Sequence, residues 1–247
     1  MTRRIAYLTD IHLDEEFPAE NGVNSKENWG LILSDVRSRG IDEIYFGGDI
    51  GSQAINAWFF DSLKDFKINL VLGNHDHFSE THKHLKGISS HSSTELYYAL
   101  EDQRYKYVFL DSSSGTISKP QYEWFCEEIN TKKPLLMFIH HPILPIEVKV
   151  DELYGLTNRD KIVEQLDQLQ HDVTVFCGHY HMNDIRTTGR IRQIVTPACS
   201  YQAEKNPLEI RVNNASFGYR IIDLTAHSLE TYLIKYEHGH FQLQAKD

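Results

Sequence analysis

The chain has 247 residues, of which 40% are hydrophobic and 24% charged, and its formal net charge is −10. The length suits one large domain or two small ones, and the composition is that of an ordinary globular protein. The negative charge argues against a protein that coats nucleic acid through a broad basic face. No stretch approaches the ~18 apolar residues needed to cross a bilayer, so no membrane association is expected.

The three cysteines, Cys126, Cys177 and Cys199, are odd in number and widely spaced, with no CxxC pair. This pattern predicts free thiols in a reducing compartment. The apolar run near the N-terminus is too short for a signal peptide. We therefore expect a cytoplasmic protein.

The first part of the chain alternates between strand-like and helix-like segments. Apolar runs predict strands at 5–9, 43–49 and 68–76, and apolar residues at helical spacing predict helices at 28–40 and 54–66. This β-α-β-α-β order implies parallel strands with helices on the faces of the sheet.

The remainder is more mixed, and its expected elements follow in chain order. They are two strands within 95–112, a helix at 120–130, a strand at 134–142, a helix at 159–169, a strand at 173–181, and a closing antiparallel pair at 217–224 and 228–237. No repeat or linker is evident. We expect a single α/β domain over residues 1–247, with two sheets packed together.

Polar side chains gather where the predicted strands end, which is where open α/β sheets bind their ligands. The strand ends carry Asp10, His12, Asp49, Asn74, His75, Asp76, His140, His141, His179 and His181. Oxygen and nitrogen donors without cysteine suit Mn²⁺, Fe²⁺, Zn²⁺ or similar ions. There are too many donors for one ion, and a carboxylate such as Asp49 can bridge two ions about 3.5–4 Å apart. We predict two divalent metal ions, with Mn as first choice and Fe, Zn, Ni or Co as alternatives.

The ordered motifs DxH, GD, GNHD, HP and GHxH, between residues 10 and 181, resemble those of the calcineurin-like metallophosphoesterase superfamily. The resemblance implies a four-layer α/β/β/α sandwich of two mixed sheets with a two-metal centre between them. It also implies a role for each ligand. Asp10, His12 and His181 would hold the first metal, Asn74, His140 and His179 the second, and Asp49 would bridge them.

By the same resemblance, a metal-bound hydroxide would attack phosphorus in line. His75 would bind the phosphate or protonate the leaving oxygen, and Asp76 is a candidate for orienting His75. Asn74, His75, His141 and Tyr154 are the candidate substrate contacts. Tyr154 is included because it lies in a loop, 143–158, that follows a ligand-bearing strand.

Two differences from known motifs argue against two branches of the superfamily. GDIGSQ at 48–53 lacks the arginine of the protein phosphatase motif GDxVDRG, and Ser52 stands where purple acid phosphatases have tyrosine. The pattern is closer to the cyclic-nucleotide phosphodiesterase branch. We predict a phosphodiesterase acting on a small nucleotide-type diester, with some monoesterase activity.

Two alternatives stay open at this point. One is a nuclease or end-processing phosphatase acting on DNA or RNA. The other is a metal-bound scaffold or binding protein that has lost catalysis, against which the complete ligand set and His75 argue. The sequence predicts neither the natural substrate nor an oligomeric state.

Overall fold

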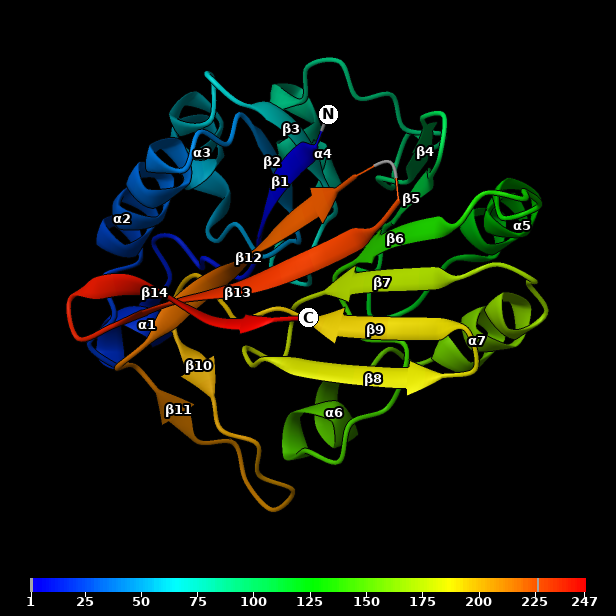
Figure 1. Ribbon diagram of the computed structural model, residues 1–247. Helices are drawn as coiled ribbons and strands as arrows, with labels where there is room; N and C mark the ends of the chain where they lie inside the picture. The colour runs from blue at the N-terminus through cyan, green and yellow to red at the C-terminus, as the bar shows by residue number, and fades with distance from the viewer. Residues whose placement is uncertain (1, 226) are drawn as a thin grey trace.

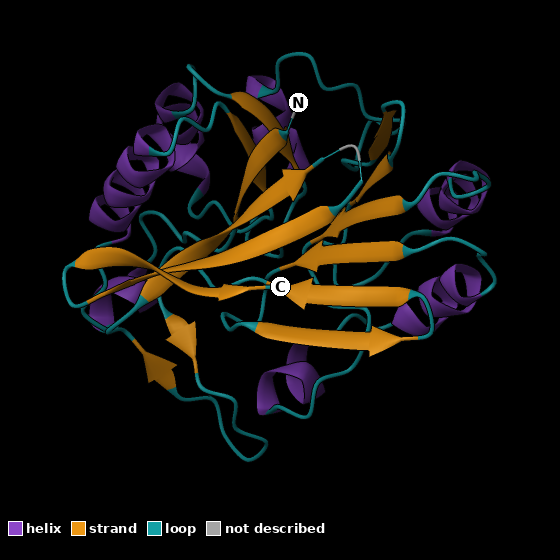
Figure 2. Cartoon of the chain, viewed as in Figure 1, coloured by secondary structure: helices purple, strands orange, loops and turns teal. Residues whose placement is uncertain are grey.

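A computed structural model describes residues 2–225 and 227–247. Two six-stranded sheets form the centre of the molecule (Figures 1 and 2). In spatial order, the first sheet consists of β14 (His240–Lys246), β13 (Leu229–Glu237), β12 (Phe217–Leu224), β1 (Arg3–Leu8), β2 (Glu43–Phe46) and β3 (Lys67–Leu70). The second consists of β4 (Tyr98–Glu101), β5 (Lys106–Leu110), β6 (Leu135–Ile139), β7 (Val173–Cys177), β9 (Ile191–Val195) and β8 (Asp184–Thr188).

Both sheets are mixed: the parallel strands form one half of the first sheet and the centre of the second. In the first sheet β1, β2 and β3 are parallel, and β12 joins β1 antiparallel. In the second, β5, β6, β7 and β9 are parallel, and β4 and β8 are antiparallel to their neighbours. The carboxyl ends of the parallel strands therefore lie along one side of each sheet, and the predicted ligands follow these ends.

Helices cover the outer faces of the two sheets (Figure 1). The first sheet carries α2 (Ser25–Ser38) and α3 (Asn56–Ser62), and the second carries α5 (Lys119–Glu128) and α7 (Arg159–Asp167). The shorter elements are α1 (Glu16–Glu20), η1 (Gln53–Ile55), α4 (Phe78–Thr81), η2 (His82–His84), α6 (Lys149–Tyr154), β10 (Gln202–Ala203) and β11 (Val212–Asn213). Among the described residues, none of the helices is both long and apolar enough to span a bilayer.

Buried aromatic rings join the two sheets. Tyr7 of β1 and Tyr45 of β2 lie 5.8 and 4.9 Å, ring centre to ring centre, from Phe138 of β6. Phe138 is in turn stacked between Phe109 and Phe176 of its own sheet. Large aromatic surfaces removed from water contribute strongly to such a core. The predicted α/β sandwich of two mixed sheets is confirmed.

Several predicted strands are shorter than expected. The strand predicted at 68–76 ends at Leu70, and that predicted at 173–181 ends at Cys177. The residues beyond these ends leave the sheet as loops that carry the candidate ligands. The closing antiparallel pair is confirmed, and a further strand, β14, extends it.

Candidate metal centre

Five of the seven candidate metal ligands share an unusual backbone conformation. Asp10, His12, Asp49, His179 and His181 have φ between 50° and 67°, in the left-handed region. This conformation is uncommon for residues other than glycine, and it costs about 1–3 kcal/mol where it is strained. Here it turns the chain sharply at the strand ends, so that side chains from β1, β2 and β7 converge on one place.

Two glycines allow the loops to approach each other closely. A Cβ atom at Gly73 would lie 2.1 Å from Oδ1 of Asp49, and one at Gly178 would lie 2.3 Å from Oδ2 of Asp10. Neither position has room for a side chain. The glycines that precede the ligands therefore leave space for the carboxylates of the neighbouring loops.

The first ligand group consists of Asp10, His12 and His181. Their donor atoms all lie within 4.8 Å of one another. Nε2 of His181 lies 3.0 Å from Nε2 of His12 and 3.4 Å from Oδ1 of Asp10. Two ring nitrogens and a carboxylate oxygen that face the same point form a typical site for a divalent transition metal.

The second group consists of Asp49, His140 and His179, with donor atoms equally close. Oδ2 of Asp49 lies 3.2 Å from Nε2 of His140 and 3.6 Å from Nε2 of His12, which belongs to the first group. One carboxylate therefore lies between the two groups, as a bridging ligand must.

Each of the four histidines in the two groups has its other ring nitrogen bonded to an oxygen acceptor. The pairs are His12 Nδ1 with Glu15 Oε2 (2.9 Å), His140 Nδ1 with the Gly47 carbonyl (2.8 Å), His179 Nε2 with the Tyr154 carbonyl (2.9 Å) and His181 Nδ1 with the Tyr201 carbonyl (3.1 Å). A carbonyl oxygen only accepts, so the nitrogen facing it must carry the hydrogen. The opposite ring nitrogen is then free to bind a metal, and such outer bonds are typical of metal-binding histidines.

His140 gives the clearest sign that a cation fits here. Its Nε2 atom is buried and makes no well-aligned hydrogen bond among the described residues, although Oδ2 of Asp49 lies 3.2 Å away. A buried polar atom without such a bond is costly and calls for an explanation. The residues present therefore fit a bound metal.

The buried carboxylates and histidines of the site shift one another's pKa values. Burial raises the pKa of Asp10, but His181 and His140 outweigh burial and lower it to about 2. Burial lowers the pKa of His140, but Asp49 and Asp10 outweigh burial and raise it to about 10. A proton and a metal ion compete for such a nitrogen, so metal binding releases the proton.

His75 lies at the open side of the centre. Its backbone N–H donates to Oδ1 of Asp49 at 2.9 Å, and its Nδ1 lies 2.9 Å from Oε1 of Glu15. The Glu15 hydrogen bond raises the pKa of His75 to about 9. The ring is 43% exposed and stands edge-on to that of His12, with 4.7 Å between ring centres. His75 is therefore within reach of a substrate at the metal centre.

Asp76 occupies a different position from the one predicted. Its carboxylate accepts hydrogen bonds from the backbone N–H groups of Asp49, Ile50 and Gly73, at 2.8 to 2.9 Å. The predicted orientation of His75 by Asp76 needs correction, because the carboxylate that contacts the His75 ring is Glu15. Asp76 instead ties the loop after β2 to the loop after β3.

Replacing Asp76 with alanine should lower the free energy of unfolding of the metal-free protein by about 3 kcal/mol. Three buried N–H groups would lose their acceptor, and each such loss costs about 1–3 kcal/mol, partly relieved by water. Urea unfolding would measure the change, with the exposed Asp61→Ala as the control that should stay within about 0.5 kcal/mol. An unchanged midpoint for Asp76→Ala would contradict this structural role.

The other predicted substrate contacts differ in their exposure to solvent. His141 is buried at 2% exposure, packs 4.0 Å from the His179 ring, and bonds Ser112 through Nδ1. This burial does not support direct substrate contact by His141. Tyr154 is exposed at the end of α6, and Asn74 is exposed in the loop that carries His75.

Sequence reasoning did not single out Glu15, Ser112 or Tyr201. Tyr201 packs 4.4 Å from the His181 ring, and its carbonyl fixes that ring. Glu15 carried a weak signal, as an acid three residues after His12. Ser112 and Tyr201 carried none.

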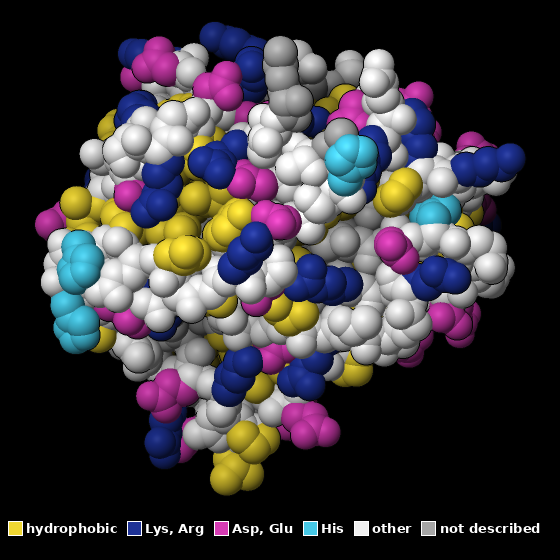
Figure 3. All heavy atoms as spheres, viewed as in Figure 1, with side chains coloured by type: hydrophobic (Ala, Val, Ile, Leu, Met, Phe, Trp, Pro, Cys, Tyr) yellow, Lys and Arg dark blue, Asp and Glu magenta, His cyan; other side chains and the backbone are white. Residues whose placement is uncertain are grey.

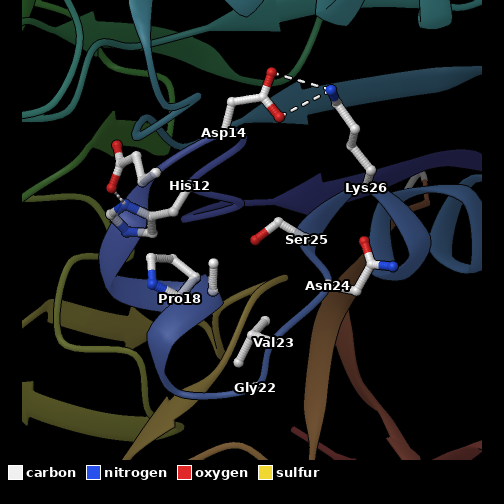
Figure 4. A pocket seen from close by; sticks show the side chains of 10 residues that line it. His12, Asp14, Pro18, Gly22, Val23, Asn24, Ser25 and Lys26 are labelled. Atoms are coloured by element: carbon white, nitrogen blue, oxygen red, sulfur yellow. Dashed lines mark hydrogen bonds and ion pairs between the residues drawn. The ribbon is translucent and has the colours of Figure 1, made fainter.

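A cavity of about 390 Å³ opens beside His12 (Figure 4). Pro18 and Val23 line its apolar side, while the ion pair of Asp14 and Lys26 lies at its edge. This volume falls in the range of small-molecule sites, which is roughly 300–1,000 Å³. Among the candidate metal ligands only His12 lines this cavity, so it lies to one side of the two ligand groups.

Two mixed sheets with convergent ligands at their edge define the fold of the metal-dependent phosphatases. The crystal structure of a dimetal phosphatase from Danio rerio shares this fold, with a TM-score of 0.67 at 12% identity, covering 97% of this chain and 98% of that one. The sequence profile described as Calcineurin-like phosphoesterase matches residues 3–183. The chain therefore belongs to the calcineurin-like phosphoesterase family, as the motifs predicted, and is a hydrolase of phosphoester bonds.

Curated relatives are similar over most of their length. A probable cyclic nucleotide phosphodiesterase from Fibrobacter succinogenes is 23% identical over 92% of both chains. The 3',5'-cyclic adenosine monophosphate phosphodiesterase CpdA of Haemophilus influenzae is 22% identical, over 90% of this chain and 85% of its own. The glycerophosphodiester phosphodiesterase GpdQ of Enterobacter lignolyticus is 24% identical, over 74% and 66% respectively.

Proposed function

We propose that this chain is a dinuclear metal-dependent phosphodiesterase that acts on small nucleotide-type diesters. The observation that carries the proposal is the position of Asp49 between two ligand groups whose four histidines each have a fixed tautomer. The oxygen and nitrogen donors without sulfur suit Mn²⁺, Fe²⁺, Zn²⁺ or similar ions, of which manganese is our first choice. The aromatic core shared by the two sheets supports a single domain over residues 1–247.

The proposed roles follow the ligand groups. Asp10, His12 and His181 would hold one ion, while His140 and His179 would hold the other with Asn74, and Asp49 would contact both. Bound divalent ions would supply an activated water and neutralise charge on the phosphoryl oxygens. His75, on the open side, would donate a hydrogen bond to the phosphate and a proton to the leaving oxygen.

Small diesters are favoured over polynucleotides by two features. The relatives are named for cyclic nucleotides and a glycerophosphodiester. On the face shown in Figure 3, Lys and Arg side chains are interspersed with Asp and Glu and form no broad basic surface. Long nucleic acids bind mainly through such basic surfaces.

The test is a substrate panel run first with a chelator and then with Mn²⁺. It comprises 3',5'-cyclic AMP, glycerophosphocholine, bis(p-nitrophenyl) phosphate, p-nitrophenyl phosphate and a single-stranded oligonucleotide. We expect Mn²⁺-dependent cleavage of the diesters, with slower cleavage of the monoester. Salt-sensitive cleavage of the oligonucleotide alone would favour the nuclease alternative. No cleavage by protein that holds two metals would favour the scaffold.

A further inference from the structure

We infer that Glu15 is a positioning residue. It fixes the orientation of the His75 ring, the proposed proton donor, relative to the ring of His12 in the metal centre. The inference rests on the proposed function and deepens it. One carboxylate oxygen, Oε2, lies 2.9 Å from Nδ1 of His12, and the other, Oε1, lies 2.9 Å from Nδ1 of His75. A single side chain therefore links a residue of the metal centre to the residue proposed to protonate the leaving group.

The local backbone delivers Glu15 to this place. Asp14 has φ 55°, which turns the chain directly after the strand-end ligands, and Glu15 is the residue before α1. The Glu15 side chain is 17% exposed, so its two hydrogen bonds are sheltered from water. Charge-assisted hydrogen bonds of this kind are short and strongly directional.

A carboxylate is the group that this geometry requires. Two N–H donors, one on each ring, need two acceptor oxygens. Glutamine has one acceptor oxygen and one amide donor, so it can satisfy only one of the rings. Glu15→Gln therefore breaks one of the two links while keeping the length and shape of the side chain.

The link controls which nitrogen of His75 faces the substrate. With Nδ1–H held by Glu15, Nε2–H is the group left to act as the acid. In the reaction a bond forms between the attacking hydroxide oxygen and phosphorus, and the bond from phosphorus to the leaving oxygen breaks. The Nε2 proton passes to that oxygen, which leaves as a neutral alcohol, while the Nδ1 proton stays on His75 and continues to donate to Glu15. A nitrophenolate leaves as a stable anion and needs no such proton.

The experiment compares two substrates in the Mn²⁺-loaded protein: 3',5'-cyclic AMP, whose leaving group is an alcohol, and bis(p-nitrophenyl) phosphate. For Glu15→Gln we expect kcat on cyclic AMP to fall about 10–100-fold, with KM within about threefold. On the aryl diester kcat should fall less than about threefold, with two ions retained. Glu16→Gln removes the neighbouring exposed charge and should match the wild type on both substrates.

Two results would overturn the inference. Equal losses on both substrates, together with a lowered metal content, would mean that Glu15 only supports His12. Unchanged kcat on both would mean that it positions neither ring. Glu15→Asp keeps both acceptor oxygens and should recover part of the activity on cyclic AMP; failure to exceed Glu15→Gln would also count against the inference.

A second readout does not depend on activity. Long-range ¹H–¹⁵N NMR of the Zn²⁺-loaded protein reports which nitrogen of each imidazole carries the proton. We expect protonated Nδ1 on both His12 and His75 in the wild type, and a change at one of them in Glu15→Gln. Identical spectra would refute the positioning role. An inactive wild type with the expected spectra would instead refute the proposed function and leave the positioning role standing.

Discussion

Replacing Asp49 with asparagine is expected to remove metal from both ligand groups together and to lower diester hydrolysis on the order of 10³-fold. Burial raises the pKa of Asp49, but His140 and His12 outweigh burial and hold it well below its ordinary value. The carboxylate is therefore charged and lies between the two groups. An amide of the same size lacks the charge and has one acceptor oxygen instead of two, so it cannot bridge two cations as well.

The measurement is metal content by elemental analysis after dialysis against Mn²⁺, alongside hydrolysis of an aryl diester. Asp223→Asn is the matched control, because Asp223 is a buried carboxylate of β12 that pairs with Arg4 away from the ligand groups. The control should keep a full metal load. A normal two-ion load in Asp49→Asn would rule out bridging, and the loss of one ion only would assign Asp49 to a single group.

The second large loss of activity is expected when His75 is replaced. His75→Ala should lower kcat on a diester with an alcohol leaving group by about 10²–10⁴-fold, because the proton donor is lost. The backbone N–H that donates to Asp49 is kept in this variant, so metal content should change little. The aryl diester should be affected less than the alkyl diester.

Steady-state kinetics on both substrates would measure this difference. His77→Ala is a suitable control, since His77 is an exposed histidine two residues away, directly before α4. Full activity of His75→Ala on the alkyl diester would assign the acid to another group. Retained cellular function of an inactive His75→Ala protein would revive the scaffold alternative.

The strand-end ligands could be predicted from the sequence because each is marked by a local pattern, a polar residue shortly after an apolar run. Asp10, Asp49 and His140 lie within three residues of the end of an apolar run, and the carboxyl ends of parallel strands meet at one side of a sheet. Their order then resembled one family, which supplied the sandwich and the pairing of ligands. The fold was therefore largely predictable from local pattern together with resemblance.

The contacts around the ligands were not predictable in the same way. Asp76 bonds backbone groups of Ile50, and Tyr201 fixes His181 from a segment without any regular pattern. Such partners depend on how closely two loops approach, and no hydrophobic period encodes that distance. The partner of His75 was missed for the same reason: Glu15 lies 60 residues earlier in the chain.

The left-handed backbone at Asp10, His12, Asp49, His179 and His181 would make the stability of the fold depend on metal supply. These residues hold an uncommon backbone conformation and bring like charges together, and a bound cation would offset that cost. A ligand that binds only the folded state adds stability in proportion to the logarithm of its concentration over Kd. A cell short of divalent metal would then contain less folded enzyme, because the unfolded fraction is open to proteolysis. Starvation for the ion would lower the amount of this hydrolase as well as its turnover.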